Sequence, residues 1–229
     1  MNKAHKIDVL LFDVNETLLD ITILEPLFLR LFNNPQVMRN WFAELVLYSQ
    51  AMTVSGLYEP FGNLALGALK MVGSNHNVVI NDEDIAEFKG LMGSLPPHPD
   101  VLPALKRLQG AGFRLATLTN SAPTASPTLL EKAEISDFFE AQFSVEEVKR
   151  FKPHPDTYQY AAKALGVELD KICLVACHLW DTLGAQTVGC SGAFITRPNN
   201  NLLITENLPQ PNFVAKDLKH FADKLLGTT

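Results

Sequence analysis

The sequence predicts an α/β fold, in which a doubly wound parallel sheet carries a helical domain inserted after its first strand. The apolar run Val9–Phe12 is short and does not alternate with polar residues, which is typical of a strand buried on both faces of a parallel sheet. Residues 21–95 show helical spacing of apolar residues, and from residue 101 onward helical and strand patterns alternate. Such alternation implies right-handed crossovers that place helices on both faces of the sheet.

The inserted segment is expected to consist of helices, because its apolar residues recur every three or four positions and Pro or Asp stands near the starts of the patterns. These patterns cover residues 25–32, 37–52, 60–72 and 82–92. Pro96, Pro97 and Pro99 then interrupt the chain, since prolines so closely spaced cannot continue a helix or a central strand. We therefore predict an inserted domain at 21–95 and a core made of 1–20 plus 96–229.

The rest of the chain alternates between the two kinds of element. Helices are expected at 101–111, 127–133, 155–165, 182–188 and 215–226, and strands at 114–120, 141–144, 172–176 and 192–196. The first strand, although distant in sequence, is expected to join these strands in one sheet.

Composition limits the classes of function. The formal net charge is -6 and the basic residues are scattered, which argues against a nucleic-acid or anionic-membrane partner. The first apolar run stops at Asp13, too early for a signal peptide or a membrane span, so we expect a cytoplasmic protein. The three cysteines, Cys173, Cys177 and Cys190, lack the spacing of a zinc site and are interpreted as reduced thiols.

Polar residues follow the ends of several predicted strands, at 13–17, 119–121, 152–156 and 177–181. Each has an ordinary interpretation, in which Asp13 starts a turn, Lys152 is a solvated charge and Asp181 caps a helix. The carboxyl ends of parallel strands, however, meet at one edge of the sheet, where open α/β folds bind their ligands. The segments together are therefore expected to supply a nucleophile, donors, a cation and a second acid to one pocket.

The order of these motifs, Asp-x-Asn-x-Thr, Thr-Asn-Ser, Lys-Pro-x-Pro-x-x-Tyr and Trp-Asp, resembles that of the haloacid dehalogenase superfamily. Residues 152–158 and 179–185 most resemble its type II, or L-2-haloacid dehalogenase, branch. The resemblance implies a Rossmann-like core with a helical cap. It also implies a hydrolase, without a cofactor, that displaces halide from a short 2-haloalkanoic acid through an aspartyl-ester intermediate.

The resemblance implies a role for each matching residue. Asp13 would be the nucleophile, Thr17 would hold it, and Lys152 would neutralise the reacting carboxylate. Asp181 would face Lys152 and help to place the hydrolytic water. The residues implied to hold or contact the substrate are Asn15, Thr119, Asn120, Tyr158 and Trp180.

Asn15 distinguishes the possible reactions. Phosphate-ester members of the superfamily resemble one another in having at this position an Asp that protonates the leaving alkoxide. An amide cannot transfer that proton, whereas a halide leaves as a stable anion and needs no acid. The final motif also begins with Cys177 and His178, which are poor Mg²⁺ ligands, so we predict no required metal. The alternatives are a Mg²⁺-dependent phosphatase or phosphonatase, a hydrolase of another small electrophile, and a non-enzymatic binding module on the same fold.

Two positions depart from the branch. Phe42 stands where the cap usually has an Arg that grips the substrate carboxylate, so Phe42 is expected to form an apolar wall and Arg39, one helical turn away, to take over. His178 is interpreted as a donor that replaces an amide, as a base for the hydrolytic water, or as a structural partner at a helix start. Aromatic residues of the cap are explained equally by burial within it and by a homodimer surface.

Overall fold

The structure is a computed structural model that describes residues 7–122 and 128–228. Within these ranges the core is a six-stranded parallel sheet with the order β3-β2-β1-β4-β5-β6. The strands are β1 (Val9–Phe12), β2 (Arg114–Thr119), β3 (Ala141–Ser144), β4 (Ile172–Ala176), β5 (Ser191–Ile195) and β6 (Phe213–Ala215). The predicted parallel sheet is confirmed.

The first strand lies in the middle of the sheet, as its composition predicts. All residues of β1 are 0% exposed, and β1 pairs with β2 on one side and with β4 on the other. The register sets Phe12 opposite Thr117 and Val175. The segments that follow these strands therefore leave the same edge of the sheet, and this is the reason that distant motifs meet there.

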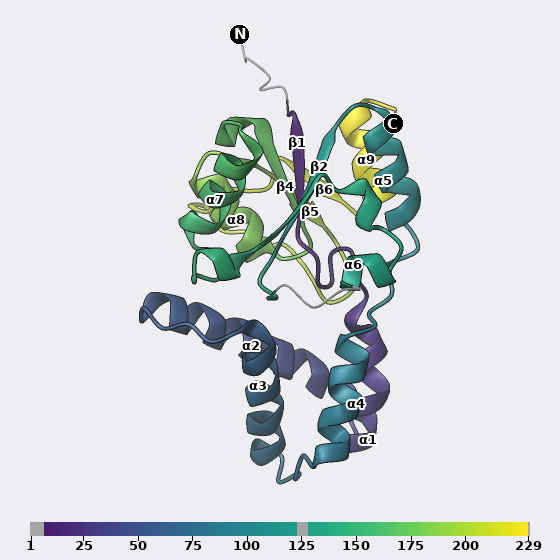
Figure 1. Cartoon of the computed structure of the whole chain (residues 1–229), viewed down its shortest axis with the longest axis vertical. Coiled ribbons are helices and arrows are strands. Elements are labelled where there is room, and N and C mark those ends of the chain that lie inside the picture. Colours follow the sequence, from purple (N-terminus) through teal and green to yellow (C-terminus); the bar gives the residue numbers. More distant parts are fainter. Residues whose placement is uncertain (1–6, 123–127, 229) are drawn as a thin grey trace.

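Helices cover both faces of the sheet, with α5 and α9 on one side and α7 and α8 on the other (Figure 1). The core helices are α5 (Val101–Gly110), α6 (Leu129–Lys132), α7 (Pro155–Leu165), α8 (Leu179–Thr187) and α9 (Leu218–Leu226). Short 3-10 helices occur at Ile21–Leu24, Ser136–Phe138, Val145–Glu147 and Leu169–Lys171. This arrangement is the predicted doubly wound α/β fold.

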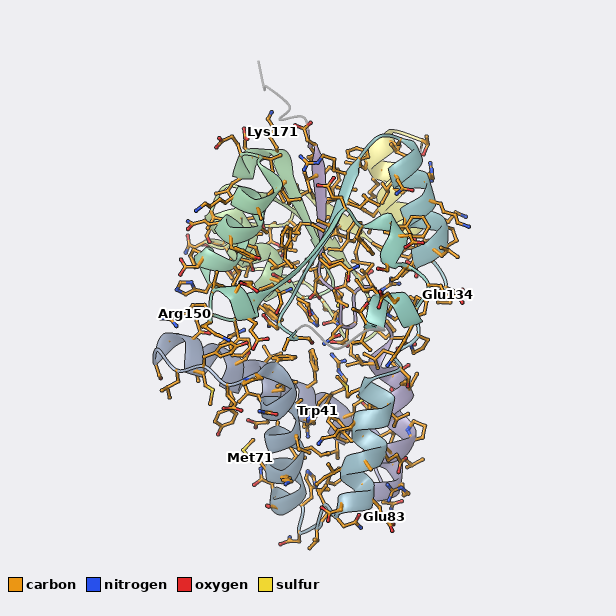
Figure 2. All side chains as sticks on the ribbon, viewed as in Figure 1. Trp41, Met71, Glu83, Glu134, Arg150 and Lys171 are labelled. Atoms are coloured by element: carbon orange, nitrogen blue, oxygen red, sulfur yellow. The ribbon has the colours of Figure 1, made fainter. Side chains whose placement is uncertain are left out.

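The insertion forms four helices below the sheet in Figure 1. They are α1 (Glu25–Phe32), α2 (Val37–Val54), α3 (Phe61–Asn75) and α4 (Asp82–Met92). Trp41 lies among them (Figure 2), with its ring centroid 5.7 Å from that of Phe28 and 5.3 Å from that of Phe88. The helices therefore share an aromatic core. None of the described helices combines the length and the apolar character needed to cross a membrane.

The chain enters and leaves the inserted helices at neighbouring points. The amide of Asp20 donates to the carbonyl of Pro96 at 2.7 Å, and Leu19 forms an isolated bridge with Pro97. This closure supports the division into a domain at 21–95 and a core at 1–20 plus 96–229, which stays a prediction.

Several element boundaries differ from those expected. Helix α8 begins at Leu179, with His178 as the residue before it, so Asp181 lies inside the first turn and does not cap the helix. The strand β6 was missed, because three residues show too little alternation to indicate a strand. The last helix accordingly begins at Leu218. Pro127, the expected start of another helix, lies outside the described residues.

Gly184 of α8 provides a test of core packing. A methyl group there would collide with the side chain of Pro153 and lie 2.7 Å from the hydroxyl of Tyr158. We expect Gly184→Ala to lower the free energy of unfolding by about 1–3 kcal/mol, as overpacking does. Gly67→Ala at an exposed position of α3, where nothing lies within 4 Å of the new methyl, should raise it by about 0.5–1 kcal/mol. Urea unfolding followed by circular dichroism measures both, and equal effects would contradict the packing argument.

Candidate active site

Asp13 directly follows β1 and is 5% exposed. Its Oδ1 accepts a hydrogen bond from Lys152 Nζ at 2.7 Å, and its Oδ2 accepts from Thr17 Oγ1 at 2.7 Å. His178 Nδ1 lies 3.0 Å from Oδ2. Burial raises the pKa of Asp13, but Lys152 and His178 outweigh it, so this pKa lies well below its usual range. The carboxylate is therefore ionised and held in one orientation.

Lys152 is a fully buried cation with several acceptors around its ammonium group. Besides Asp13, Nζ donates to Asp181 Oδ2 at 2.6 Å and to the carbonyl of Leu118 at 2.9 Å. Its backbone amide donates to Asn120 Oδ1 at 3.0 Å. Burial lowers the pKa of Lys152, but the two carboxylates raise it above its ordinary value. Lys152 is thus a charged counter-ion shared by two acids, and Asn120 holds its backbone.

Asp181 is 0% exposed and has a donor on each oxygen. Oδ1 accepts from the hydroxyl of Tyr158 at 2.6 Å, and Oδ2 accepts from Lys152. Burial and the nearby charge of Asp13 hold the pKa of Asp181 above its ordinary value. Asp181 and Tyr158 therefore act together to orient Lys152. The expected contact of Tyr158 with substrate stays a prediction.

The ring of His178 lies between two carboxylates and between two aromatic rings. Nδ1 faces Asp13, and Nε2 lies 2.9 Å from Glu16 Oε2. The ring stacks on Phe42, with centroids 5.5 Å apart, and on Trp180, with centroids 5.0 Å apart. Burial lowers the pKa of His178, but the Cys177 sulfur and the two carboxylates raise it well above its ordinary value. Because both ring nitrogens face carboxylates, the geometry favours the imidazolium form.

Glu16 is the site residue that the sequence did not indicate. It lies in the loop after β1 with φ 61°, and its side chain is 6% exposed. Its Oε1 forms an ion pair with Nη1 of Arg39, while Oε2 faces His178. No sequence pattern pairs an acid in this loop with residues 23 and 162 positions away. Only the fold brings the three together.

The inserted helices contribute Arg39 and Phe42 from α2, so both predicted residues reach the site. The guanidinium of Arg39 lies 5.8 Å from the ring centroid of Phe42. Both residues line a cavity of about 380 Å³ whose wall also includes His178 and Trp180. Arg39 contributes to that wall a guanidinium, which stays charged at any physiological pH. The position fits the expected contact with a substrate carboxylate, which stays a prediction.

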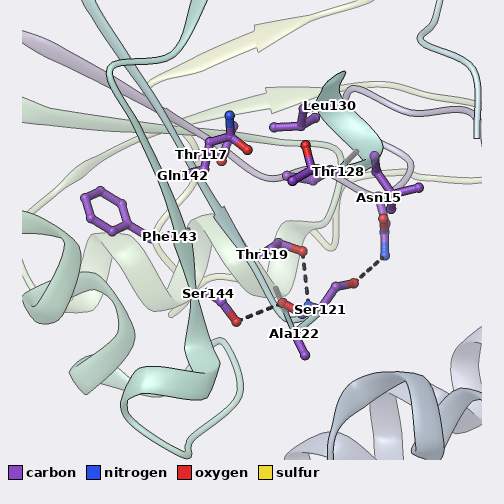
Figure 3. Close-up of a pocket in the computed structure, with 12 residues that line it drawn as sticks. Asn15, Thr117, Thr119, Ser121, Ala122, Thr128, Leu130, Gln142, Phe143 and Ser144 are labelled. Atoms are coloured by element: carbon purple, nitrogen blue, oxygen red, sulfur yellow. Dashed lines mark hydrogen bonds between the residues drawn. The ribbon is translucent and has the colours of Figure 1, made fainter. Parts of the chain in front are cut away.

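Asn15 and Thr119 line a second cavity, of about 250 Å³, on another side of the site (Figure 3). Asn15 Nδ2 donates to Ser121 Oγ at 3.3 Å, whereas Asn15 Oδ1 is buried without a partner among the described residues. Thr119 Oγ1 accepts from the amide of Ser121 at 3.1 Å. Thr119 and Asn15 thus lie on either side of Ser121, and Oδ1 of Asn15 remains available to a ligand.

The described residues include one cluster with the composition of a metal site. Ligand atoms of Asp13, Cys177 and His178 lie within 4.8 Å of one another. Mg²⁺ prefers oxygen ligands in an octahedral arrangement, and this cluster offers a sulfur, a nitrogen and one carboxylate. That carboxylate already pairs with the buried ammonium of Lys152. The donor set does not fit Mg²⁺, and a reaction without metal stays our prediction.

Comparison with known proteins identifies a family of hydrolases and relatives along most of the chain. The family model of haloacid dehalogenase-like hydrolases matches residues 7–189. An (S)-2-haloacid dehalogenase of Pseudomonas fluorescens is 24% identical over 219 residues, which cover 95% of this chain and 96% of that protein. One from Xanthobacter autotrophicus is 27% identical over 202 residues, which cover 87% of this chain and 79% of that protein.

Solved structures show the same fold. The crystal structure of the L-2-haloacid dehalogenase RSc1362 is 23% identical, with a TM-score of 0.91, and covers 96% of this chain and 99% of its own. The L-2-haloacid dehalogenase from Xanthobacter autotrophicus with chloropropionic acid covalently bound is 24% identical, with a TM-score of 0.85. That likeness covers 97% of this chain and 100% of the other.

Removal of the buried ammonium should be costly. We expect Lys152→Met to lower the free energy of unfolding by about 3–5 kcal/mol at neutral pH, because Asp13 and Asp181 lose their counter-ion. The difference from the parent protein should shrink as the pH falls and these carboxylates become protonated. Lys149→Met, at a side chain that is 54% exposed, should cost less than about 1 kcal/mol. Urea unfolding at several pH values would contradict this account if both variants lost equal stability.

The charge on His178 predicts a dependence of stability on pH. Since the folded-state pKa is raised, the contribution of His178 is complete below the unfolded value of 6.5 and is lost as the pH rises through the folded pKa. The difference in unfolding free energy between the parent protein and His178→Gln should therefore decrease with rising pH. His98→Gln should show the opposite trend, because burial and Arg197 lower the pKa of His98. Parallel trends in the two variants would refute the assignment.

Proposed function

The chain belongs to the haloacid dehalogenase-like hydrolases, and we propose that it is a 2-haloacid dehalogenase that releases halide from short 2-haloalkanoic acids. The observation that carries this proposal is the ionised Asp13 carboxylate, which is paired with Lys152 at 2.7 Å and is followed two residues later by Asn15. Such a carboxylate is an oxygen nucleophile, and a departing halide needs no proton. The relatives named as (S)-2-haloacid dehalogenases support the same reaction.

In the first step an oxygen of Asp13 attacks the α-carbon in line with the carbon–halogen bond, and the halide leaves with the bonding electrons. Among the described side chains, Oδ1 accepts only from Lys152, whereas Oδ2 accepts from Thr17 and faces His178, so Oδ1 is the less engaged oxygen. Lys152 and Thr17 keep the carboxylate aimed. The product of this step is an ester of Asp13 with inverted configuration at carbon.

Water then attacks the carboxyl carbon of the Asp13 ester. Esterification removes one of the two negative charges that raise the pKa of His178, so the imidazolium becomes more acidic and can release its proton. After the imidazolium has released its proton to solvent, neutral His178 accepts a proton from the attacking water and returns it to the departing alkoxide, which gives the 2-hydroxy acid and leaves Asp13 as the carboxylic acid. Asp13 then transfers its proton to His178, which restores both the carboxylate and the imidazolium. Thr17, whose hydroxyl faces Oδ2, stabilises the oxyanion that forms on this oxygen, while Lys152 stays beside Oδ1. Asp181 contributes by holding Lys152, because both of its oxygens are engaged.

A hydrolase of another small electrophile is the second candidate. The observation in its favour is the ion pair of Arg39 with Glu16, which already partly neutralises the cation expected to bind a substrate carboxylate. An uncharged halogenated substrate would be compatible with that pairing. The donor set around Asp13 and the amide of Asn15 argue against the phosphatase alternative.

Halide release from a panel of 2-chloro and 2-bromo acids tests the proposal. We expect turnover without added metal, and a loss on the order of 10³-fold or more in Asp13→Asn, because the amide cannot displace halide. A single turnover in ¹⁸O-labelled water should place the label in Asp13. Release only from uncharged substrates would favour the second candidate, and absence of release from every haloacid would contradict the proposal.

A further inference from the structure

Glu16 contacts two cations at once, and one of them belongs to the inserted helices. One carboxylate oxygen pairs with Arg39 on α2, and the other lies 2.9 Å from Nε2 of His178, which follows β4. The side chain is 6% exposed. Glu16 therefore connects the inserted helices to His178, which itself contacts Asp13, through a single carboxylate.

The backbone around Glu16 is held in an uncommon conformation. Its φ of 61° lies in the left-handed region, where a residue with a long side chain is unusual. The carbonyl of Glu16 also lies 2.9 Å from Nε2 of His98, in the segment where the chain returns from the insertion. Contacts on both the backbone and the side chain thus fix the position of this carboxylate.

Arg39 retains donors for a second anion. Its ion pair with Glu16 uses Nη1, and neither Nε nor Nη2 has a hydrogen-bond partner among residues 7–122 and 128–228. The side chain is 21% exposed and lines the cavity of about 380 Å³. The other lining residues are Phe42, Ala43, Val46, Leu47, Gln50, His178, Trp180 and Asn200, and none of them is an acid. An anion that binds in this cavity therefore contacts a guanidinium whose orientation is already fixed by its ion pair with Glu16.

We propose that Glu16 is a positioning residue that makes the site selective for substrates with a carboxylate, because it aims Arg39 at the cavity while it holds His178 against Asp13. The inference rests on the proposed function and identifies a residue that determines which class of substrate binds. Glu16 acts through Arg39 and His178 and does not touch the reacting atoms. Burial raises the pKa of Glu16, but His178 and Arg39 outweigh it, so the carboxylate stays ionised.

Glu16→Gln is the test, because the amide has the same shape but only one acceptor oxygen. We expect propionate, a carboxylate without a leaving group, to bind at least tenfold more weakly by calorimetry, and KM for a 2-haloacid to rise by a similar factor. Glu16→Asp, which keeps the charge, should recover part of both. Arg39→Lys should weaken propionate binding without moving the pH profile.

The pH profile separates positioning from a general structural role. The charged or titratable groups around His178 are Asp13, Glu16, Cys177, Arg39 and Lys152. Without the negative charge of Glu16, the limb of the kcat profile that belongs to His178 should move to lower pH. A loss of stability alone would not move it.

Glu140→Gln is the matched control, because it breaks an ion pair with Arg114 in which the two side chains are 37% and 41% exposed. It should leave KM, propionate binding and the pH profile unchanged. Tighter propionate binding by Glu16→Gln would show that Glu16 competes with substrate, and this would overturn the proposal, as would unchanged binding and an unchanged profile. Propionate binding requires no halide release, so failure of the proposed reaction can be recognised separately.

Discussion

The site depends on one interaction, the burial of the Lys152 ammonium between the carboxylates of Asp13 and Asp181 at 2.7 and 2.6 Å. None of the three charges is stable alone in a dry interior, because an unpaired buried ion loses its hydration without compensation. Asp13 follows β1, Lys152 follows β3 and Asp181 lies at the start of α8. The strand order that brings these segments together is therefore also the arrangement that satisfies the charges.

The network of alternating charges extends beyond this triad to the inserted helices. Asp13 faces His178, His178 faces Glu16, and Glu16 pairs with Arg39 on α2. A change of charge at Asp13 therefore alters the surroundings of His178 directly. Stacking of His178 between Phe42 and Trp180 keeps the ring in the plane that both carboxylates require. The helices outside the sheet thus complete the polar network of the core.

The chemistry of single positions narrows the function within the family. Asn15 has no acidic proton to transfer to a leaving group, and its buried Oδ1 lacks a hydrogen-bond partner among the described residues. Thiol and imidazole groups stand near the nucleophile, where a magnesium enzyme would need oxygen ligands. Both features are compatible with displacement at carbon and unfavourable for phosphoryl transfer. Membership of the family establishes the fold, and the proposed displacement at carbon rests on these local features.

The sequence alone determined the sheet, the inserted helices and the residues around Lys152, because each follows from a local pattern: a buried apolar strand, a helical period, or a polar residue just after a strand. It did not determine Glu16, the pairing of Arg39, the ring partners of His178, or the short strand β6. Those features depend on contacts between segments far apart in the chain and on a backbone turn at φ 61°. Tertiary structure decided them, because the charge of a buried residue is set by the neighbours that the fold supplies.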